Sequence, residues 1–135
     1  MSGYKNKKSS KQIRILLAED EQIYQKIIER YIHSFDFEVT IVEDGNQCIL
    51  EAEADKYDII LMDIVMPGKN GIEAAMELRK RGIKTPIIAV TSGAWAEEKI
   101  KSINSGMNDF IAKPFHAKKL AKKIAYWTKY QGLSA

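Results

Sequence analysis

Short apolar runs alternate with segments of helical hydrophobic spacing along most of the chain, and this alternation constrains the fold more than any other feature. Each of five runs is short enough for a strand buried on both faces, and each following segment places apolar residues three or four positions apart. Parallel strands need a crossover connection, usually a helix. The sequence therefore predicts an α/β fold, a doubly wound five-stranded parallel sheet covered by five helices.

The predicted elements follow from these patterns and from glycine and proline punctuation. The five predicted strands cover residues 13–18, 37–42, 57–62, 86–90 and 108–112. The five predicted helices cover residues 23–35, 44–54, 72–81, 94–105 and 116–130. Gly82 and Gly106 are predicted to end the third and fourth helices, and residues 66–71 form a loop.

Three helices carry apolar stripes that are predicted to face the sheet. The first stripe consists of Ile23, Ile27, Ile28, Tyr31, Ile32 and Phe35, and the second of Ile49, Leu50 and Ala54. The stripe of the last helix consists of Leu120, Ala121, Ile124 and Trp127. Lysines on the other faces of the last helix make a basic surface, which is either solvated or a docking surface for an acidic protein.

Size and composition fit one globular domain. The chain has 135 residues, 45% of them apolar and 29% charged. We expect a flexible basic tail over residues 1–11, the domain over 12–131 and a C-terminal tail over 132–135. The net charge is +3, and without the four lysines of the first tail it would be near −1, which disfavours nucleic acid as a partner. No apolar run is long enough to span a membrane, and a lone cysteine, Cys48, fits the cytoplasm.

Polar residues follow the predicted strands at their carboxyl ends, where sites form in sheets of this kind. Glu19 and Asp20 follow the first strand, and Asp63 follows the third. Thr91 and Ser92 follow the fourth strand, and Lys113 follows the fifth. Carboxylates gathered at one rim repel one another unless a cation lies among them, and oxygen ligands favour Mg²⁺, with Mn²⁺ as an alternative.

These residue types suit phosphoryl transfer to a carboxylate. Asp63 would be the nucleophile and would form an acyl phosphate. Lys113 and the Thr91 hydroxyl would bind phosphoryl oxygens as charge develops on them. Taken singly, the residues have plainer interpretations: Asp63 as a turn residue, Glu19 and Asp20 as caps of the first helix, Thr91 as a cap, and Lys113 as a solvated lysine.

Four segments in this order resemble the receiver domains of bacterial-type response regulators and hybrid histidine kinases. The segments are residues 15–21, 58–68, 87–92 and 109–115, and the resemblance extends from about residue 13 to about residue 126. It implies a flavodoxin-like fold with strand order 2-1-3-4-5. It also implies a phosphorylation-dependent switch that catalyses only its own phosphorylation and dephosphorylation.

The resemblance assigns roles residue by residue. Asp63 matches the phosphorylated aspartate, Asp20 a direct metal ligand, Glu19 its acidic partner, and Val65 the position whose backbone carbonyl binds the metal. Thr91 and Lys113 match the switch hydroxyl and the phosphate-binding lysine. Ser92 fills a position that must be small, and Pro114 matches a proline that usually follows a cis peptide bond.

Two departures from the family pattern carry consequences. The aromatic switch position is Phe110, where many relatives have Tyr, so the ring offers no hydroxyl. Ser92 replaces the commoner Ala but remains small. The variable positions beside the site are Val65 and Gly93, and neither side chain can orient an attacking water. We therefore expect slow self-dephosphorylation.

The implied partners are a histidine kinase or a histidine phosphotransfer protein as phosphodonor, and a downstream protein on the face of the fourth helix, fifth strand and fifth helix. Two alternatives stay open. One is a phosphatase with an aspartate nucleophile, which is disfavoured because Val65 stands where such enzymes place a second Asp. The other is a receiver-like module that binds partners without phosphorylation. The cognate kinase and the output are not encoded in any motif, and the chain is compatible with a stand-alone regulator or a receiver excised from a hybrid kinase.

Overall fold

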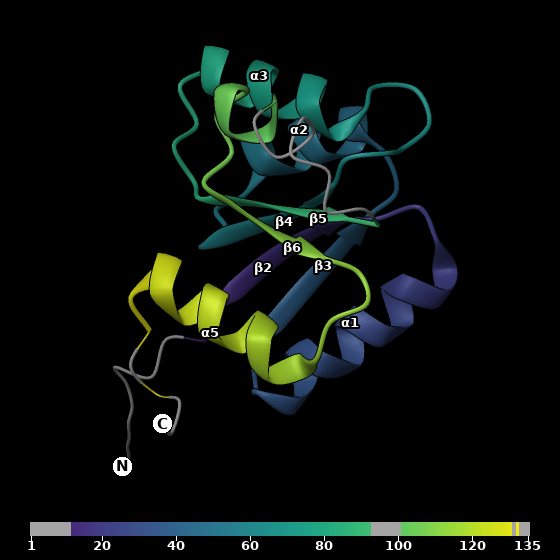
Figure 1. Ribbon diagram of the computed structural model, residues 1–135. Helices are drawn as coiled ribbons and strands as arrows, with labels where there is room; N and C mark the ends of the chain where they lie inside the picture. Colours follow the sequence, from purple (N-terminus) through teal and green to yellow (C-terminus); the bar gives the residue numbers. More distant parts are fainter. Residues whose placement is uncertain (1–11, 93–100, 131, 133–135) are drawn as a thin grey trace.

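A five-stranded parallel sheet forms the centre of the structure, a computed structural model that describes residues 12–92, 101–130 and 132 (Figure 1). The strands are β2 (Arg14–Ala18), β3 (Glu38–Val42), β4 (Ile59–Asp63), β5 (Ile87–Thr91) and β6 (Asp109–Ala112). The helices with described bounds are α1 (Gln22–Ser34), α2 (Gly45–Ala54), α3 (Gly71–Lys80) and α5 (Ala117–Thr128). Residues 101–104 are also helical, while the rest of the predicted fourth helix, with Trp95, lies outside the described residues.

The sheet has the order β3-β2-β4-β5-β6 with parallel pairing throughout, which confirms the predicted order 2-1-3-4-5. From β2 the chain first moves outward to β3 and then returns to the other side of β2 to form β4. The direction of winding therefore reverses between β2 and β4. Loops leave such a reversal in opposite directions and open a crevice at the carboxyl ends of the two strands.

The strands alternate their side chains between two core layers. On β2, Ile15 and Leu17 pack against apolar residues of α1 and α5, whereas Leu16 and Ala18 pack against α2 and α3. Figure 1 shows these two helix pairs on opposite faces of the sheet. Because both faces are covered, the central strands β4 and β5 are buried at every position, which explains their nearly continuous apolar sequences.

Two helices bury side chains that differ from the predicted ones. Ile23 is 69% exposed and Ile27 is also exposed, so the buried stripe of α1 is carried by Ile28 and Ile32. On α2, Leu50 is 65% exposed and Ala54 is exposed, and the buried residues include Cys48 and Ile49. Each helical residue points about 100° away from the one before it, so a sheet that contacts a narrow stripe leaves the next apolar position in solvent.

Other predicted local features are confirmed, with strand bounds shifted by one or two residues. Gly82 and Gly106 follow their helices with φ of +81° and +106°. Glycine adopts these backbone angles readily because it has no Cβ to clash with the backbone. The peptide bond between Lys113 and Pro114 is cis. On α5 the predicted stripe faces the core, with Trp127 only half-buried. The predicted tails lie outside the described residues except for residue 132, and no described helix has the length and apolarity to cross a membrane.

Adjacent residues on α2 test this packing. We expect Ile49→Ala to lower the free energy of unfolding by about 2–5 kcal/mol, since it removes a buried side chain and leaves a cavity. Leu50→Ala removes an exposed side chain, and its effect should stay within about 0.5 kcal/mol. Urea denaturation of both variants measures the difference. Equal losses of unfolding free energy in the two variants would show that α2 does not present Ile49 to the core and Leu50 to solvent.

Candidate functional site

The carboxyl ends of four strands bring the predicted site residues to one edge of the sheet. Asp63 is the last residue of β4 and Thr91 the last of β5. Glu19 and Asp20 follow directly after β2, and Lys113 follows directly after β6. Residues that stand up to 94 positions apart in the sequence become neighbours because parallel strands all end on the same side.

Three carboxylates form the acidic part of the site. Glu19, Asp20 and Asp63 each offer an oxygen, and these oxygens all lie within 4.8 Å of one another. Glu19 is fully buried and Asp63 is 7% exposed, whereas Asp20 is exposed. At such separations like charges repel strongly, most of all where water is excluded.

Lys113 supplies the positive charge of the cluster. Its Nζ lies 2.9 Å from Glu19 Oε1 and 3.3 Å from Asp63 Oδ2, and the lysine side chain is only 5% exposed. The interpretation of Lys113 as a solvated lysine is therefore wrong. A third carboxylate, Glu21, lies 3.9 Å from the same Nζ but is largely exposed.

Burial and charge act together on the titration of this pair. Burial raises the pKa of Glu19 above its ordinary value, the Asp63 carboxylate adds to the rise, and Lys113 opposes it. Burial lowers the pKa of Lys113, but its contacts with Glu19 and Asp63 outweigh burial and raise that pKa overall. Lys113 thus stays an ammonium ion inside the site.

The turn after β4 holds the Asp63 side chain in place. The Val65 backbone N–H donates to Asp63 Oδ1 at 3.2 Å. Further along, a Cβ at Gly71 would collide with the Asp63 carbonyl oxygen, so only glycine allows α3 to begin this close to the strand. Asn70 and Glu73 form a reciprocal capping box that starts α3 at this point.

The remaining predicted residues occupy different surroundings. Thr91 is 6% exposed, and its carbonyl oxygen accepts a 2.7 Å hydrogen bond from the Lys113 backbone N–H. Ser92 is exposed, and the Val65 side chain is also exposed to solvent. Phe110 is half-buried against the core layer of α2 and α3. Gly93 lies outside the described residues.

The helix-cap interpretation of the acidic pair is not supported. The N-cap of α1 is Glu21, and neither Glu19 nor Asp20 occupies that position. Glu19 Oε2 does accept a hydrogen bond from the Glu21 backbone N–H at 3.1 Å, so it stabilises the turn that leads into the helix. Its second oxygen remains directed into the site.

That second oxygen provides a test of whether a metal ion fits. Glu19 Oε1 is fully buried, and the Lys113 ammonium that lies 2.9 Å from it is shared with Asp63. One lysine faces three clustered carboxylates, so the cluster keeps an excess of negative charge. Mg²⁺ prefers carboxylate oxygens and needs only one or two of them. The residues present therefore fit a magnesium ion.

Two contacts near the site were not predicted. The Lys113 Nζ lies 4.1 Å from the centroid of the Tyr24 ring on α1. The Asp109 carboxylate on β6 accepts hydrogen bonds from Trp127 Nε1 at 2.9 Å and from Lys123 Nζ at 3.0 Å, which join β6 to α5. Trp127 belongs to the predicted apolar stripe of the last helix, and no sequence pattern singles out Tyr24. Helical spacing shows which face of a helix is buried and not which strand residue it meets.

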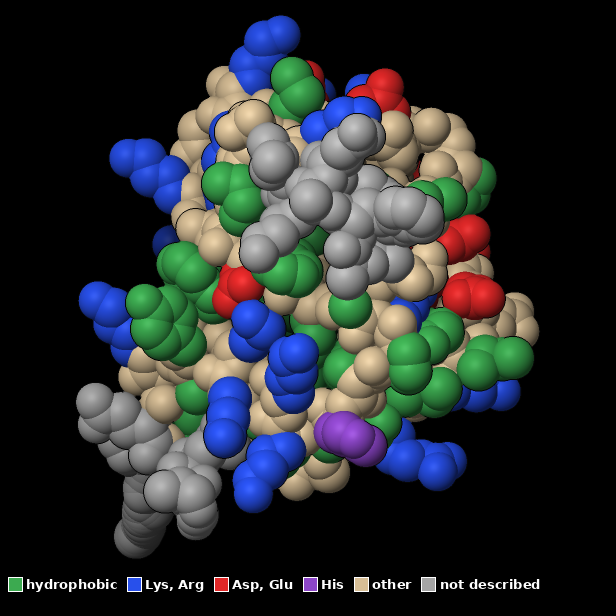
Figure 2. Space-filling model, viewed as in Figure 1, with side chains coloured by type: hydrophobic (Ala, Val, Ile, Leu, Met, Phe, Trp, Pro, Cys, Tyr) green, Lys and Arg blue, Asp and Glu red, His purple; other side chains and the backbone are tan. Residues whose placement is uncertain are grey.

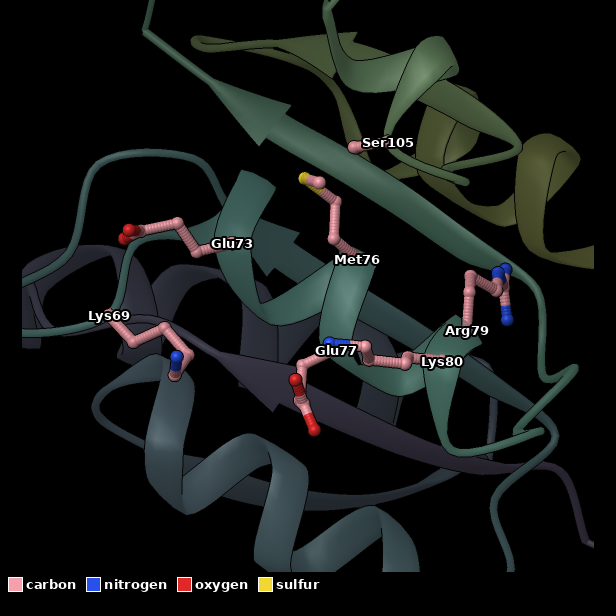
Figure 3. A pocket seen from close by; sticks show the side chains of 7 residues that line it. All are labelled: Lys69, Glu73, Met76, Glu77, Arg79, Lys80 and Ser105. Carbon is pink, nitrogen blue, oxygen red and sulfur yellow. The ribbon is translucent and has the colours of Figure 1, made fainter.

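Away from the acidic cluster, two surface features are prominent. Figure 2 shows lysine side chains gathered over α5, where the exposed members include Lys118, Lys119, Lys122 and Lys129. Figure 3 shows a hollow along α3. Its lining residues are Lys69, Glu73, Met76, Glu77, Arg79, Lys80 and Ser105. It contains none of the predicted site residues.

Comparisons with known proteins agree with this arrangement. The family model described as the response regulator receiver domain matches residues 15–125. The receiver domain of sensor histidine kinase PA1611 from Pseudomonas aeruginosa PAO1 is 37% identical, with a TM-score of 0.83 over 89% of this chain and 100% of that chain. That structure has a magnesium ion coordinated in its active site cleft.

Two further relatives extend the comparison. The transcriptional regulatory protein CiaR of Streptococcus pneumoniae is 34% identical over 120 residues, which cover 89% of this chain and 53% of CiaR. A co-crystal structure from Saccharomyces cerevisiae contains the histidine phosphotransfer protein Ypd1 and the receiver domain of its downstream response regulator Ssk1. The match is 28% identical, has a TM-score of 0.82 and covers 90% of this chain and 92% of that chain. The chain spans about half or less of the length of the curated relatives it matches.

A double-mutant cycle tests the pairing of Lys113 with Glu19. Lys113→Met leaves two buried carboxylates without their cation, so we expect the free energy of unfolding to fall by about 3 kcal/mol. In the Glu19→Gln background the same substitution should cost at least about 1 kcal/mol less, because glutamine carries no charge.

Urea unfolding in the presence of a chelator measures all four proteins without interference from metal ions. Lys118→Met, at an exposed position of α5, is the matched control and should change stability by less than about 0.5 kcal/mol. The same cost for Lys113→Met in both backgrounds would refute a stabilising interaction between the two charges.

Proposed function

The chain belongs to the response regulator receiver domain family of two-component signalling, and we propose that Asp63 is the residue through which it receives a phosphoryl group. One observation carries this assignment. Asp63 lies at the carboxyl end of a central strand, with two other carboxylates around it and the Lys113 ammonium 3.3 Å from one of its oxygens. A purely structural role of Asp63 as a turn residue would not require it to share the buried Lys113 ammonium with Glu19.

The transfer step uses a carboxylate as nucleophile. An Asp63 oxygen forms a bond to phosphorus while the bond between phosphorus and the imidazole nitrogen of a phosphohistidine breaks, and the nitrogen keeps the electron pair. Lys113 lies close enough to exchange its carboxylate contacts for phosphoryl oxygens. Thr91, at the end of the neighbouring strand, would donate its hydroxyl to the same group, and Ser92 would leave room beside it.

Glu19, Asp20, Asp63 and the Val65 carbonyl would hold Mg²⁺, with Mn²⁺ as an alternative. The bound ion would neutralise the acidic cluster and the phosphoryl oxygens together. The clustered carboxylate oxygens, with one lysine shared between Glu19 and Asp63, support this assignment.

The comparisons support a phosphohistidine protein as the donor. The receiver domain of Ssk1 was crystallised with a histidine phosphotransfer protein, and PA1611 is a sensor histidine kinase. We infer that the donor for this chain is a protein of one of these two kinds. The buried, unpaired thiol of Cys48 fits a reducing compartment, so a cytoplasmic location is part of the proposal.

The output surface proposed for this chain is the face of the fourth helix, β6 and α5. Thr91 ends β5 and Phe110 lies on the neighbouring β6, so a shift of the Thr91 hydroxyl toward a phosphoryl group would free space for the Phe110 ring. Asp109, next to Phe110, is hydrogen-bonded to Lys123 and Trp127 of α5. Movement at Phe110 would therefore reach α5 and shift the population of a partner-binding surface.

The alternatives have weaker support. A phosphatase would need a second acid beside Asp63, and Val65 is an apolar residue whose side chain faces solvent. A module that never accepts phosphate would not need the Lys113 charge in a buried site. The chain therefore acts on its own aspartate rather than on an external substrate.

Phosphorylation itself is the direct test. With Mg²⁺ and acetyl phosphate, we expect intact mass spectrometry to show one acid-labile phosphoryl group, because Asp63 is the aspartate of the cluster that contacts Lys113. Asp63→Ala and removal of Mg²⁺ should abolish the signal, and Lys113→Ala should reduce it strongly. Asp58→Ala, at an aspartate just before β4, is the control and should leave uptake intact. Wild-type protein that gains no phosphate would defeat the proposal.

The lifetime of the phosphoryl group gives a second test. Val65 places an apolar side chain beside the site, so no side chain at this position can activate water, and we expect a half-life of many minutes or longer. Val65→Glu should shorten the half-life several-fold by offering a general base, whereas Val65→Leu should leave it unchanged. A wild-type half-life of seconds would contradict the expectation.

A further inference from the structure

The Tyr24 ring covers the Lys113 ammonium on the side of α1. The distance from Nζ to the ring centroid is 4.1 Å, well inside the range of a cation–π contact. The same Nζ is 2.9 Å from Glu19 Oε1 and 3.3 Å from Asp63 Oδ2. The ammonium is therefore held between two carboxylates and one aromatic face, which explains why a long, flexible side chain is 5% exposed.

Core packing and a neighbouring hydrogen bond hold Tyr24 in place. The ring packs against the core layer formed with α1 and α5. The next residue, Gln25, donates from Nε2 to the Glu19 carbonyl oxygen at 2.6 Å and so ties the first turn of α1 to the loop that carries the acidic pair. The first turn of α1, which carries Tyr24, is thus linked directly to the segment that carries Glu19.

We propose that Tyr24 is a positioning residue for phosphoryl transfer, which holds the Lys113 ammonium at the site through the face of its ring. The proposal rests on the function proposed for Asp63 and Lys113. Lysine has four rotatable bonds, and ordering such a chain costs conformational entropy each time a phosphoryl group binds. A ring that is already in place reduces that cost.

An aromatic face suits this task better than another carboxylate. The ring attracts the cation through its quadrupole but has no net charge. It therefore repels the incoming phosphoryl oxygens far less than a carboxylate would, and an N–H that points at the ring leaves the other ammonium protons for those oxygens. Glu19 and Asp63 can release Lys113 to the phosphoryl group while Tyr24 continues to hold it.

Beryllofluoride, used with Mg²⁺ as a stand-in for the phosphoryl group, and acetyl phosphate are the two probes. We expect Tyr24→Leu to weaken beryllofluoride binding and to slow phosphorylation by acetyl phosphate, each by about tenfold, because the ring face is lost. Tyr24→Phe keeps the ring and should stay within about twofold of wild type in both measurements.

Two further variants separate electrostatics from shape. Pentafluorophenylalanine at position 24 keeps the ring shape but removes its negative face, so it should behave like Tyr24→Leu. Tyr57→Leu is the matched control, since Tyr57 is also half-buried and also contacts a cation, with Arg14 Cζ 4.9 Å from its ring centroid, at the opposite end of the sheet. It should change neither measurement, whatever it does to the melting temperature.

The outcomes are distinct. An unchanged Tyr24→Leu, a Tyr24→Phe as weak as Tyr24→Leu, or a fluorinated ring that behaves like tyrosine would each overturn the role of the ring face. If Tyr57→Leu weakened beryllofluoride binding and slowed phosphorylation as much as Tyr24→Leu does, the effect of Tyr24→Leu would reflect general destabilisation of the fold. Wild-type protein that takes up neither probe would instead defeat the function proposed for Asp63, before Tyr24 is considered.

Discussion

The ion pairs of Lys113 with Glu19 and Asp63 are the interactions on which the carboxyl edge of the sheet depends. Lys113 follows β6 at one margin of the sheet, yet its ammonium reaches Glu19, which follows β2 beyond two intervening strands. Without that cation, the buried carboxylates of Glu19 and Asp63 would face each other beside the exposed carboxylate of Asp20, all three with oxygens within 4.8 Å. The ion pair between Lys113 and Glu19 thus links the end of β6 to the end of β2.

The site has less positive than negative charge, and this imbalance favours the binding of a cation. Among the described residues one ammonium faces three clustered carboxylates, and the buried Glu19 oxygen shares that ammonium with Asp63. A divalent ion and a phosphoryl group bring opposite charges that such a cluster can accommodate together. A stable but incompletely neutralised arrangement of this kind can respond to a ligand without a change of fold.

Contacts around the site link it to the rest of the domain. Tyr24 and Gln25 connect it to α1, and the cap of α3 at Asn70 lies just beyond the Asp63 turn. Asp109 connects β6 to α5, whose exposed side is lined by lysines (Figure 2). The site therefore contacts, directly or through one neighbour, several elements of the fold.

The sequence by itself determined the fold class and the set of residues at the strand ends, and its resemblance to receiver domains added the strand order. Apolar runs and helical spacing are local patterns, and parallel strands with helical crossovers bring their carboxyl ends together whatever the details of packing. The resemblance to receiver domains then predicted roles for Asp63, Thr91 and Lys113. Tertiary structure decided which apolar positions are buried, as the exposure of Leu50 and Ile23 shows. It also decided that Lys113 meets the face of Tyr24, because a contact between a helix and a distant strand depends on how the helix is rotated and placed on the sheet, and no local pattern records that.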